Sequence, residues 1–179
     1  MVKAAKQIRF HGKGFDKQGD CFGGSLLKGN NPKTKRPLES KLPIHLVLRA
    51  KKGVLRLPKT FKQVNETVTE TSKKHGVKIY KYANLGNHLH ILIKISSVRR
   101  WAAFIRELTG RIAQLVKELT LDDDSFWLHR PFTRIVRGWQ KAFKTAKEYV
   151  ELNQLEANGH ISRHETKTLK DLRTIFSDA

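Results

Sequence analysis

Alternation of apolar and polar positions predicts four strands in the part of the chain that begins at residue 43. The first strand is expected over 44–49 and the second over 77–84. The third lies in the run 86–95, and it follows the second so closely that the two should form a hairpin. A fourth extended segment is expected over 126–137, where Pro131 interrupts it.

Helices are expected where apolar residues recur at helical spacing, and at the charged C-terminal end of the chain. Their predicted ranges are 58–74, 98–119, 140–155 and 162–176. The elements then follow the order strand, helix, strand, strand, helix, strand, helix, with one helix appended. This order predicts an α+β fold, a ferredoxin-like antiparallel sheet backed by helices, with the strand of the run 86–95 in its centre.

Composition divides the chain into three parts. Residues 1–41 are basic, rich in glycine and poor in periodic apolar residues, so we expect an N-terminal arm. Residues 42–157 hold the predicted sheet and its helices, and residues 158–179 hold the appended C-terminal helix. The arm could be a disordered tail, or a segment that becomes ordered against the body or on nucleic acid. We expect the body to fold without it, because the predicted core begins at Ile44.

The net charge of the chain is +20, from 36 lysines and arginines against 16 acidic residues. Such an excess is unusual for an enzyme that acts on small neutral molecules, and it indicates a polyanionic partner, above all a nucleic acid. Cys21 is the one cysteine, which excludes an internal disulfide and a cysteine-based zinc finger. No apolar run approaches the roughly 20 residues of a membrane span, and no signal peptide is recognisable. We therefore expect a cytoplasmic, nucleoid-associated protein with no membrane partner.

The run 86–95 contains two histidines, His88 and His90, separated by one residue. Side chains alternate along a strand, so both imidazoles leave the same face, with their Cβ atoms roughly 7 Å apart and within reach of one metal ion. The intervening aliphatic residues take the opposite face and can enter a core. Taken alone, this motif is explained more simply by two histidines that bind no ligand. His45 could face either the core or the open face of the sheet, and we assign it no role.

Tyr149 and Asn153 are four residues apart in the helix expected over 140–155, so their side chains lie on one helix face. A helix placed over the sheet could bring both to the two histidines. A metal ion held there would polarise a phosphodiester oxygen, and the phenolic oxygen could attack phosphorus to leave a covalent phosphotyrosine. With oxygen ligands from the substrate, Mg²⁺ or Mn²⁺ suits this chemistry better than a closed structural zinc site.

Four short motifs together resemble a known family. Residues 87–93, Asn-His-Leu-His-Ile-Leu-Ile, resemble the His-hydrophobe-His strand of the single-tyrosine HUH transposases. Residues 43–49 resemble the first strand of these proteins, and the segment 126–137 contains a similar Phe-Trp pair and arginine. Residues 148–154, Glu-Tyr-Val-Glu-Leu-Asn-Gln, resemble the Tyr-Ile-x-x-Asn-Pro stretch of the REP-associated tyrosine transposases. The resemblance covers roughly residues 41 to 157.

This resemblance implies the HUH endonuclease fold and a metal-dependent nickase and ligase that acts on single-stranded DNA folded into a hairpin or palindromic repeat. It implies that Tyr149 is the nucleophile and that His88, His90 and Asn153 bind the divalent ion. Gln154 stands where many relatives have proline and could replace Asn153 as the third ligand, although helical phase favours Asn153. Relatives include both monomers and homodimers, so the oligomeric state stays open.

Basic residues on the predicted elements are candidates for contacts with DNA phosphates. They are Lys94 on the face of the two histidines, Arg99, Arg100, Arg106 and Arg111 along the second helix, and Arg137 in the fourth extended segment. Each could instead be an ordinary solvated side chain. The leading hypothesis is an active transposase-type enzyme that cuts and rejoins DNA. The alternative is a non-catalytic or domesticated nucleic-acid-binding protein that retains the HUH fold.

Overall fold

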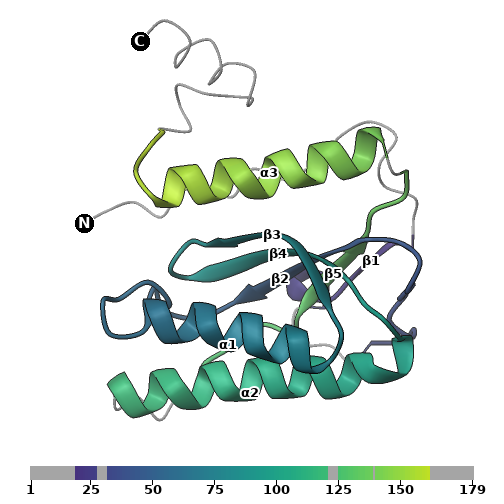
Figure 1. Ribbon diagram of the computed structural model, residues 1–179. Helices are drawn as coiled ribbons and strands as arrows, with labels where there is room; N and C mark the ends of the chain where they lie inside the picture. Colours follow the sequence, from purple (N-terminus) through teal and green to yellow (C-terminus); the bar gives the residue numbers. More distant parts are fainter. Residues whose placement is uncertain (1–18, 28–31, 121–124, 139, 162–179) are drawn as a thin grey trace, which may run out of the picture.

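The computed structural model describes residues 19–27, 32–120, 125–138 and 140–161, and these residues form one antiparallel sheet with helices on both faces (Figure 1). The strands of the described part are β1 (Cys21–Phe22), β2 (Ile44–Arg49), β3 (Lys78–Asn84), β4 (His88–Lys94) and β5 (Phe132–Ile135). Their order across the sheet is β1-β5-β2-β4-β3, and all neighbours are antiparallel. The predicted α+β fold with an antiparallel sheet is confirmed, and β4 is an interior strand.

Two helices cover one face of the sheet and a third covers the other (Figure 1). They are α1 (Phe61–Lys74) and α2 (Trp101–Thr120) on the first face and α3 (Lys141–Ala157) on the second, with short 3-10 turns η1 (Gly24–Leu26) and η2 (Val98–Arg100). The Ser97 side chain accepts a hydrogen bond from the Arg99 amide, as expected for a cap. None of the described helices has the length and apolar composition that crossing a membrane requires. The helix expected over 162–176 lies outside the described residues.

The alternation in β4 separates a core face from a site face. Leu89, Ile91 and Ile93 are fully buried against α1 and α2, in the larger of two apolar clusters. The side chains of His90 and Leu92 leave the other face, where Leu92 joins a smaller cluster with α3. The strand therefore supports a stable core on one side while its histidines lie under α3.

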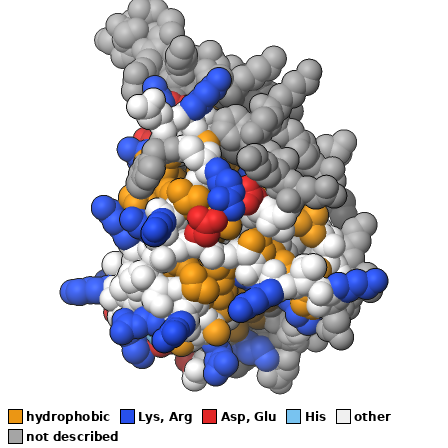
Figure 2. All heavy atoms as spheres, turned by 90° about the vertical axis from the view of Figure 1, so that its right-hand side faces the viewer, with side chains coloured by type: hydrophobic (Ala, Val, Ile, Leu, Met, Phe, Trp, Pro, Cys, Tyr) orange, Lys and Arg blue, Asp and Glu red, His pale blue; other side chains and the backbone are white. Residues whose placement is uncertain are grey.

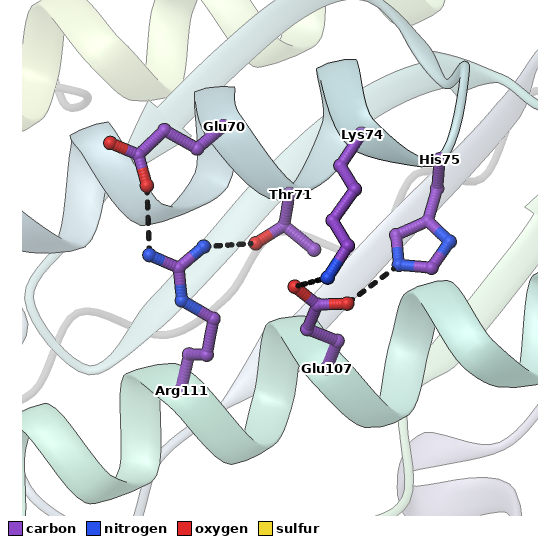
Figure 3. Close-up of polar contacts among 6 residues, drawn as sticks. All are labelled: Glu70, Thr71, Lys74, His75, Glu107 and Arg111. Carbon is purple, nitrogen blue, oxygen red and sulfur yellow. Dashed lines mark hydrogen bonds and ion pairs between the residues drawn. The ribbon is translucent and has the colours of Figure 1, made fainter.

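Polar contacts join α1 to α2 at the outer side of the larger core (Figure 3). Both Lys74 and His75 contact the carboxylate of Glu107 at 2.9 Å. The hydrogen bond from Lys74, and then the one from His75, lower the pKa of Glu107 below its ordinary value. One turn further along α2, Arg111 contacts Glu70 at 2.8 Å and the Thr71 hydroxyl at 3.2 Å. These contacts fix the two helices relative to each other.

The described residues of the N-terminal segment pack against the body. The sequence left open whether this segment is disordered or ordered, and these residues are ordered against the body. Strand β1, which was not predicted, pairs with β5. Asp20 accepts hydrogen bonds of 2.8 and 3.0 Å from Nε of Arg137, and Glu39 forms an ion pair with the same guanidinium at 2.8 Å. Arg36 donates to the Thr133 hydroxyl at 2.7 Å, next to the ring of Phe22. The boundary at residue 41 stays a prediction, but residues on both sides of it contribute to one sheet.

The fourth extended segment is shorter than expected. Only Phe132–Ile135 of the range 126–137 forms a strand, after Pro131. Before Pro131, a single antiparallel bridge joins Trp127 to Ala50. Proline lacks the amide hydrogen that a continuous ladder needs, so the segment reaches the sheet in two separate places.

Candidate active site

Three histidine rings and one tyrosine ring lie together between the sheet and α3. The His88 and His90 rings are neighbours on β4, with centroids 4.8 Å apart. The ring of Tyr149 meets His90 edge-on at 5.5 Å and His45 edge-on at 5.8 Å. The structure thus brings His90 of the predicted metal site, with His88 beside it, next to the predicted nucleophile Tyr149, which is 59 residues later in the sequence.

Small residues on α3 allow the helix to approach the sheet closely. Ala142, Ala146 and Val150 are buried at helical spacing and pack with Leu92 of β4. Asn153 continues this stripe and is only 1% exposed, while Tyr149 is half-buried beside it. The Asn153 amide group donates a hydrogen bond of 2.6 Å to the Tyr149 carbonyl oxygen one turn earlier. The stripe places both predicted site residues of α3 toward the histidine face of the sheet.

The ring nitrogens of the two β4 histidines show which atoms could bind a metal. Nδ1 of His88 is hydrogen-bonded to the side-chain oxygen of Asn87, which can only accept, so this nitrogen carries the hydrogen. Nδ1 of His90 is hydrogen-bonded to Nε2 of His45 at 2.9 Å. Histidines that bind metals usually use one ring nitrogen and hydrogen-bond through the other. Both rings fit this pattern with Nε2 as the ligand atom.

His45 is a buried member of the site that sequence reasoning left without a role. It is 8% exposed, and burial, together with the charge of Arg134 opposite it on β5, lowers its pKa to about 4. The ring is therefore neutral near pH 7. The sequence contains a signal for this position. Alternation in 44–49 places His45 on one face of the strand and the apolar side chains of Ile44 and Leu46 on the other face.

The donors of the site suit a hard or borderline divalent ion. Within the described ranges, no group of three histidine, cysteine, aspartate or glutamate side chains could hold a metal ion. A metal on His88 and His90 would therefore need an amide oxygen or oxygens from a substrate as further ligands. The oxygen ligands of such a set, from an amide and from the substrate, suit Mg²⁺ or Mn²⁺. Asn153 offers such an amide on the buried face of α3.

Gln154, the other residue considered as a ligand, is engaged elsewhere. Its side-chain oxygen accepts a hydrogen bond of 3.1 Å from the backbone amide of Asn84 at the end of β3. Its side-chain nitrogen donates to the Asn158 side-chain oxygen at 2.8 Å. Arg56 joins this cluster by donating to the Asn84 carbonyl at 2.9 Å. The cluster fastens the C-terminal end of α3 to the β3–β4 hairpin.

The residues predicted to bind DNA are divided between the two faces of the sheet. Lys94 is at the end of β4 on the histidine face, whereas α2, with Arg106 and Arg111, covers the opposite face (Figure 1). Arg99 and Arg100 lie in the turn η2, directly before α2. Arg99, Arg100 and Arg106 are exposed, Arg111 is held by Glu70, and Arg137 is held by Asp20 and Glu39. On the face seen in Figure 2, Lys and Arg side chains surround an apolar patch and form no single track. Their roles toward DNA stay predictions.

Comparison with known proteins gives a family. Residues 39–153 match the family model described as "Transposase IS200 like". The structure of a REP-associated tyrosine transposase bound to a REP hairpin has a TM-score of 0.56 and 12% identity, over 70% of this chain and 74% of that one. A proposed transposase from Deinococcus radiodurans has a TM-score of 0.46 and 16% identity, over 69% and 98% of the two chains. No curated protein is a significant match. At 12% identity the first of these structures supports the fold alone.

Proposed function

The chain belongs to the family of IS200-like transposases, and on that premise we propose that it cuts and rejoins single-stranded DNA through a covalent bond between Tyr149 and a 5′ phosphate. The observation that carries this proposal is the edge-on contact of Tyr149 with His90, at 5.5 Å between ring centroids. A phenol, two imidazoles and a side-chain amide in one half-buried site are the groups that such a transesterification needs.

The chemical step transfers one phosphodiester bond to the protein. The phenolic oxygen of Tyr149 attacks phosphorus and loses its proton to water. The bond between phosphorus and the 3′ oxygen breaks, and the leaving 3′ oxygen takes up a proton. Rejoining reverses the step: a 3′ hydroxyl attacks the phosphotyrosine and the phenol is released. The energy of the phosphodiester bond is kept in the protein–DNA bond, so no further cofactor has to supply it.

The divalent ion would be held by Nε2 of His88, Nε2 of His90 and the side-chain oxygen of Asn153. When bound, Mg²⁺ or Mn²⁺ supplies a Lewis acid that polarises a phosphodiester oxygen. Asn87 and His45 hydrogen-bond to the Nδ1 atoms of the two histidines and orient the rings. Burial of His90 and Asn153, each 1% exposed, restricts the access of water to the ligands.

The proposed substrate is a hairpin or palindromic repeat in single-stranded DNA. The net charge of +20 supports a polyanion, and the solved relative with a REP hairpin supports this class of DNA. Most of the affinity would come from lysine and arginine contacts with phosphates, and little from the metal site. Binding and cleavage should therefore be separable by substitution.

The experiment uses a hairpin oligonucleotide labelled at its 3′ end, with Mg²⁺ or Mn²⁺ and with a chelator. We expect cleavage by the wild type only with the divalent ion. His88→Ala and His90→Ala should lose cleavage and keep DNA binding. His160→Ala, which removes an exposed histidine after α3, is the matched control and should cleave normally. Full cleavage by His90→Ala in chelator would contradict the proposal, and binding without cleavage by the wild type would favour the non-catalytic alternative.

A further inference from the structure

His45 and His90 face each other end to end across two neighbouring strands. Nε2 of His45 is 2.9 Å from Nδ1 of His90, and the rings are 14° from coplanar with centroids 5.1 Å apart. The centroid separation is the nitrogen–nitrogen distance plus one ring radius at each end, so the two nitrogens point at each other. The N–H of one ring can therefore point at the lone pair of the other. The contact is therefore a hydrogen bond and not a pair of ligands to one ion.

A hydrogen bond between two neutral imidazoles contains one hydrogen, which belongs either to Nδ1 of His90 or to Nε2 of His45. In the first arrangement, Nε2 of His90 keeps its lone pair and can bind a metal. In the second arrangement, Nε2 of His90 carries a hydrogen and cannot bind one. The choice between these tautomers decides whether His90 can be a ligand.

We propose that His45 is a positioning residue, which accepts a hydrogen bond from Nδ1 of His90 and so leaves Nε2 of His90 to bind the divalent ion. This inference rests on the function proposed above. His88 has the corresponding partner in Asn87, its neighbour in sequence. His90 obtains its partner from β2, through the pairing of the sheet.

The fold holds His45 in place for this role. Strand β2 is hydrogen-bonded to β4 on one side and β5 on the other, so its backbone position is fixed. His45 is directly opposite Leu92, two residues along β4 from His90, and all three side chains leave the same face. With His45 8% exposed and His90 1% exposed, bulk water cannot readily replace either partner of the hydrogen bond.

The inference predicts that His45 affects metal affinity without touching the metal. Loss of a partner that orients a ligand typically weakens metal binding by roughly 10- to 100-fold. His45→Leu should show this loss, because leucine fills space and cannot accept a hydrogen bond. His45→Gln should recover most of the affinity, because its side-chain oxygen can reach the position of the histidine Nε2 and accept. Val47→Ala is the packing control, since Val47 is directly opposite His90 and makes no side-chain hydrogen bond.

Two measurements that do not depend on activity test the inference. Free Mn²⁺ measured by electron paramagnetic resonance gives the affinity of each variant. Long-range ¹H–¹⁵N correlation spectra of the histidine rings give the tautomer of His90, without metal and with saturating Mg²⁺. We expect the wild type, Val47→Ala and His45→Gln to have the Nδ1–H tautomer of His90 with Mg²⁺. His45→Leu should bind Mn²⁺ more weakly and show hydrogen on Nε2 in the metal-free protein.

The outcomes separate this inference from the function on which it rests. If His45→Leu binds Mn²⁺ as the wild type does and keeps the Nδ1–H tautomer, the role of His45 is refuted while the metal site stands. If Mn²⁺ does not bind the wild type, or Mg²⁺ leaves the signals of His88 and His90 unchanged, the metal site itself is wrong, and the inference with it. Should His45→Leu fail to fold, His45→Val, which also cannot accept a hydrogen bond, replaces it with the same expected results.

Discussion

The side-chain oxygen of Gln154 accepts a hydrogen bond from the backbone amide of Asn84, 3.1 Å away, at the point where β3 enters the hairpin. This contact turns Gln154 toward the hairpin, while its neighbour Asn153 is on the buried stripe of α3. Adjacent residues of one helix thus have different surroundings, because successive side chains are about 100° apart around the helix axis. The two residues considered as third metal ligand can therefore be separated by substitution.

Asn153→Ala should weaken Mn²⁺ binding and abolish cleavage, because it removes the proposed oxygen ligand. Gln154→Ala should leave Mn²⁺ affinity within about twofold of the wild type. It should lower the free energy of unfolding by about 1 to 2 kcal/mol, because the side chain makes two hydrogen bonds, each usually worth about 1 kcal/mol. Metal titration and urea denaturation of both variants measure these effects. If Gln154→Ala folds normally but no longer binds Mn²⁺, the third ligand is Gln154 and not Asn153.

The free energy of unfolding of the metal-free protein should decrease as the pH is lowered from 7 to 5. Burial, and then Arg134, lower the pKa of His45 to about 4 in the folded state, from an ordinary value of 6.5. Between these values the unfolded chain binds a proton at His45 and the folded protein does not, so stability is lost as the pH falls. The expected contribution of His45 is about 2 kcal/mol over this interval. Urea denaturation at each pH measures it.

His45→Gln is the control for this pH dependence, because glutamine does not titrate. The other ionisable groups are common to both proteins, so the difference between their two pH profiles isolates His45. We expect the profile of His45→Gln to be flatter from pH 7 to pH 5. Parallel profiles would mean that His45 takes up a proton as readily in the folded protein as in the unfolded chain.

Arg106 and Arg111 on α2 should differ in their effect on DNA binding. Both substitutions to alanine remove one positive charge, but Arg106 is exposed whereas Arg111 is held by Glu70 and Thr71. If Arg106 contacts a phosphate, its loss should reduce the slope of log affinity against log salt, by about 0.9 for a phosphate in the duplex stem of a hairpin and about 0.7 for one in a single strand. Arg111→Ala should change this slope little and cost less than about 1 kcal/mol of stability.

Fluorescence anisotropy of a labelled hairpin at several salt concentrations gives both slopes. Equal reductions in Arg106→Ala and Arg111→Ala would indicate that DNA responds only to net charge. Unchanged slopes in both would place the DNA away from α2, on the histidine face of the sheet.

The elements that carry the site could be predicted because each has a local pattern. In β4, the period of two residues places His88 and His90 on one face and apolar residues such as Ile91 in the core, where the structure has them. In α3, the spacing of four residues places Tyr149 and Asn153 one turn apart. A pattern of this kind is contained in a few consecutive residues, so a single sequence displays it.

The contacts that the sequence did not reveal join distant parts of the chain. Strand β1 has two residues, too few for a periodic pattern, and it is held at the sheet edge by β5. Arg137, predicted to contact DNA, is paired with Asp20, which is 117 residues earlier. The hydrogen bond between His45 and His90 depends on the register of β2 with β4. Registers and ion pairs of this kind are set by tertiary packing, which no local pattern reports.

The most direct test of the account is whether Tyr149 becomes covalently attached to DNA. Wild-type protein, Tyr149→Phe and Tyr80→Phe are incubated with a hairpin labelled at its 3′ end, in Mg²⁺ or Mn²⁺, and denatured. Tyr80 is the matched control, since it is a tyrosine that packs with Phe143 of α3. We predict that the wild type and Tyr80→Phe retain the 3′ label, with a peptide containing Tyr149 carrying the mass of the DNA fragment, and that Tyr149→Phe retains none. A covalent adduct in Tyr149→Phe would contradict the account.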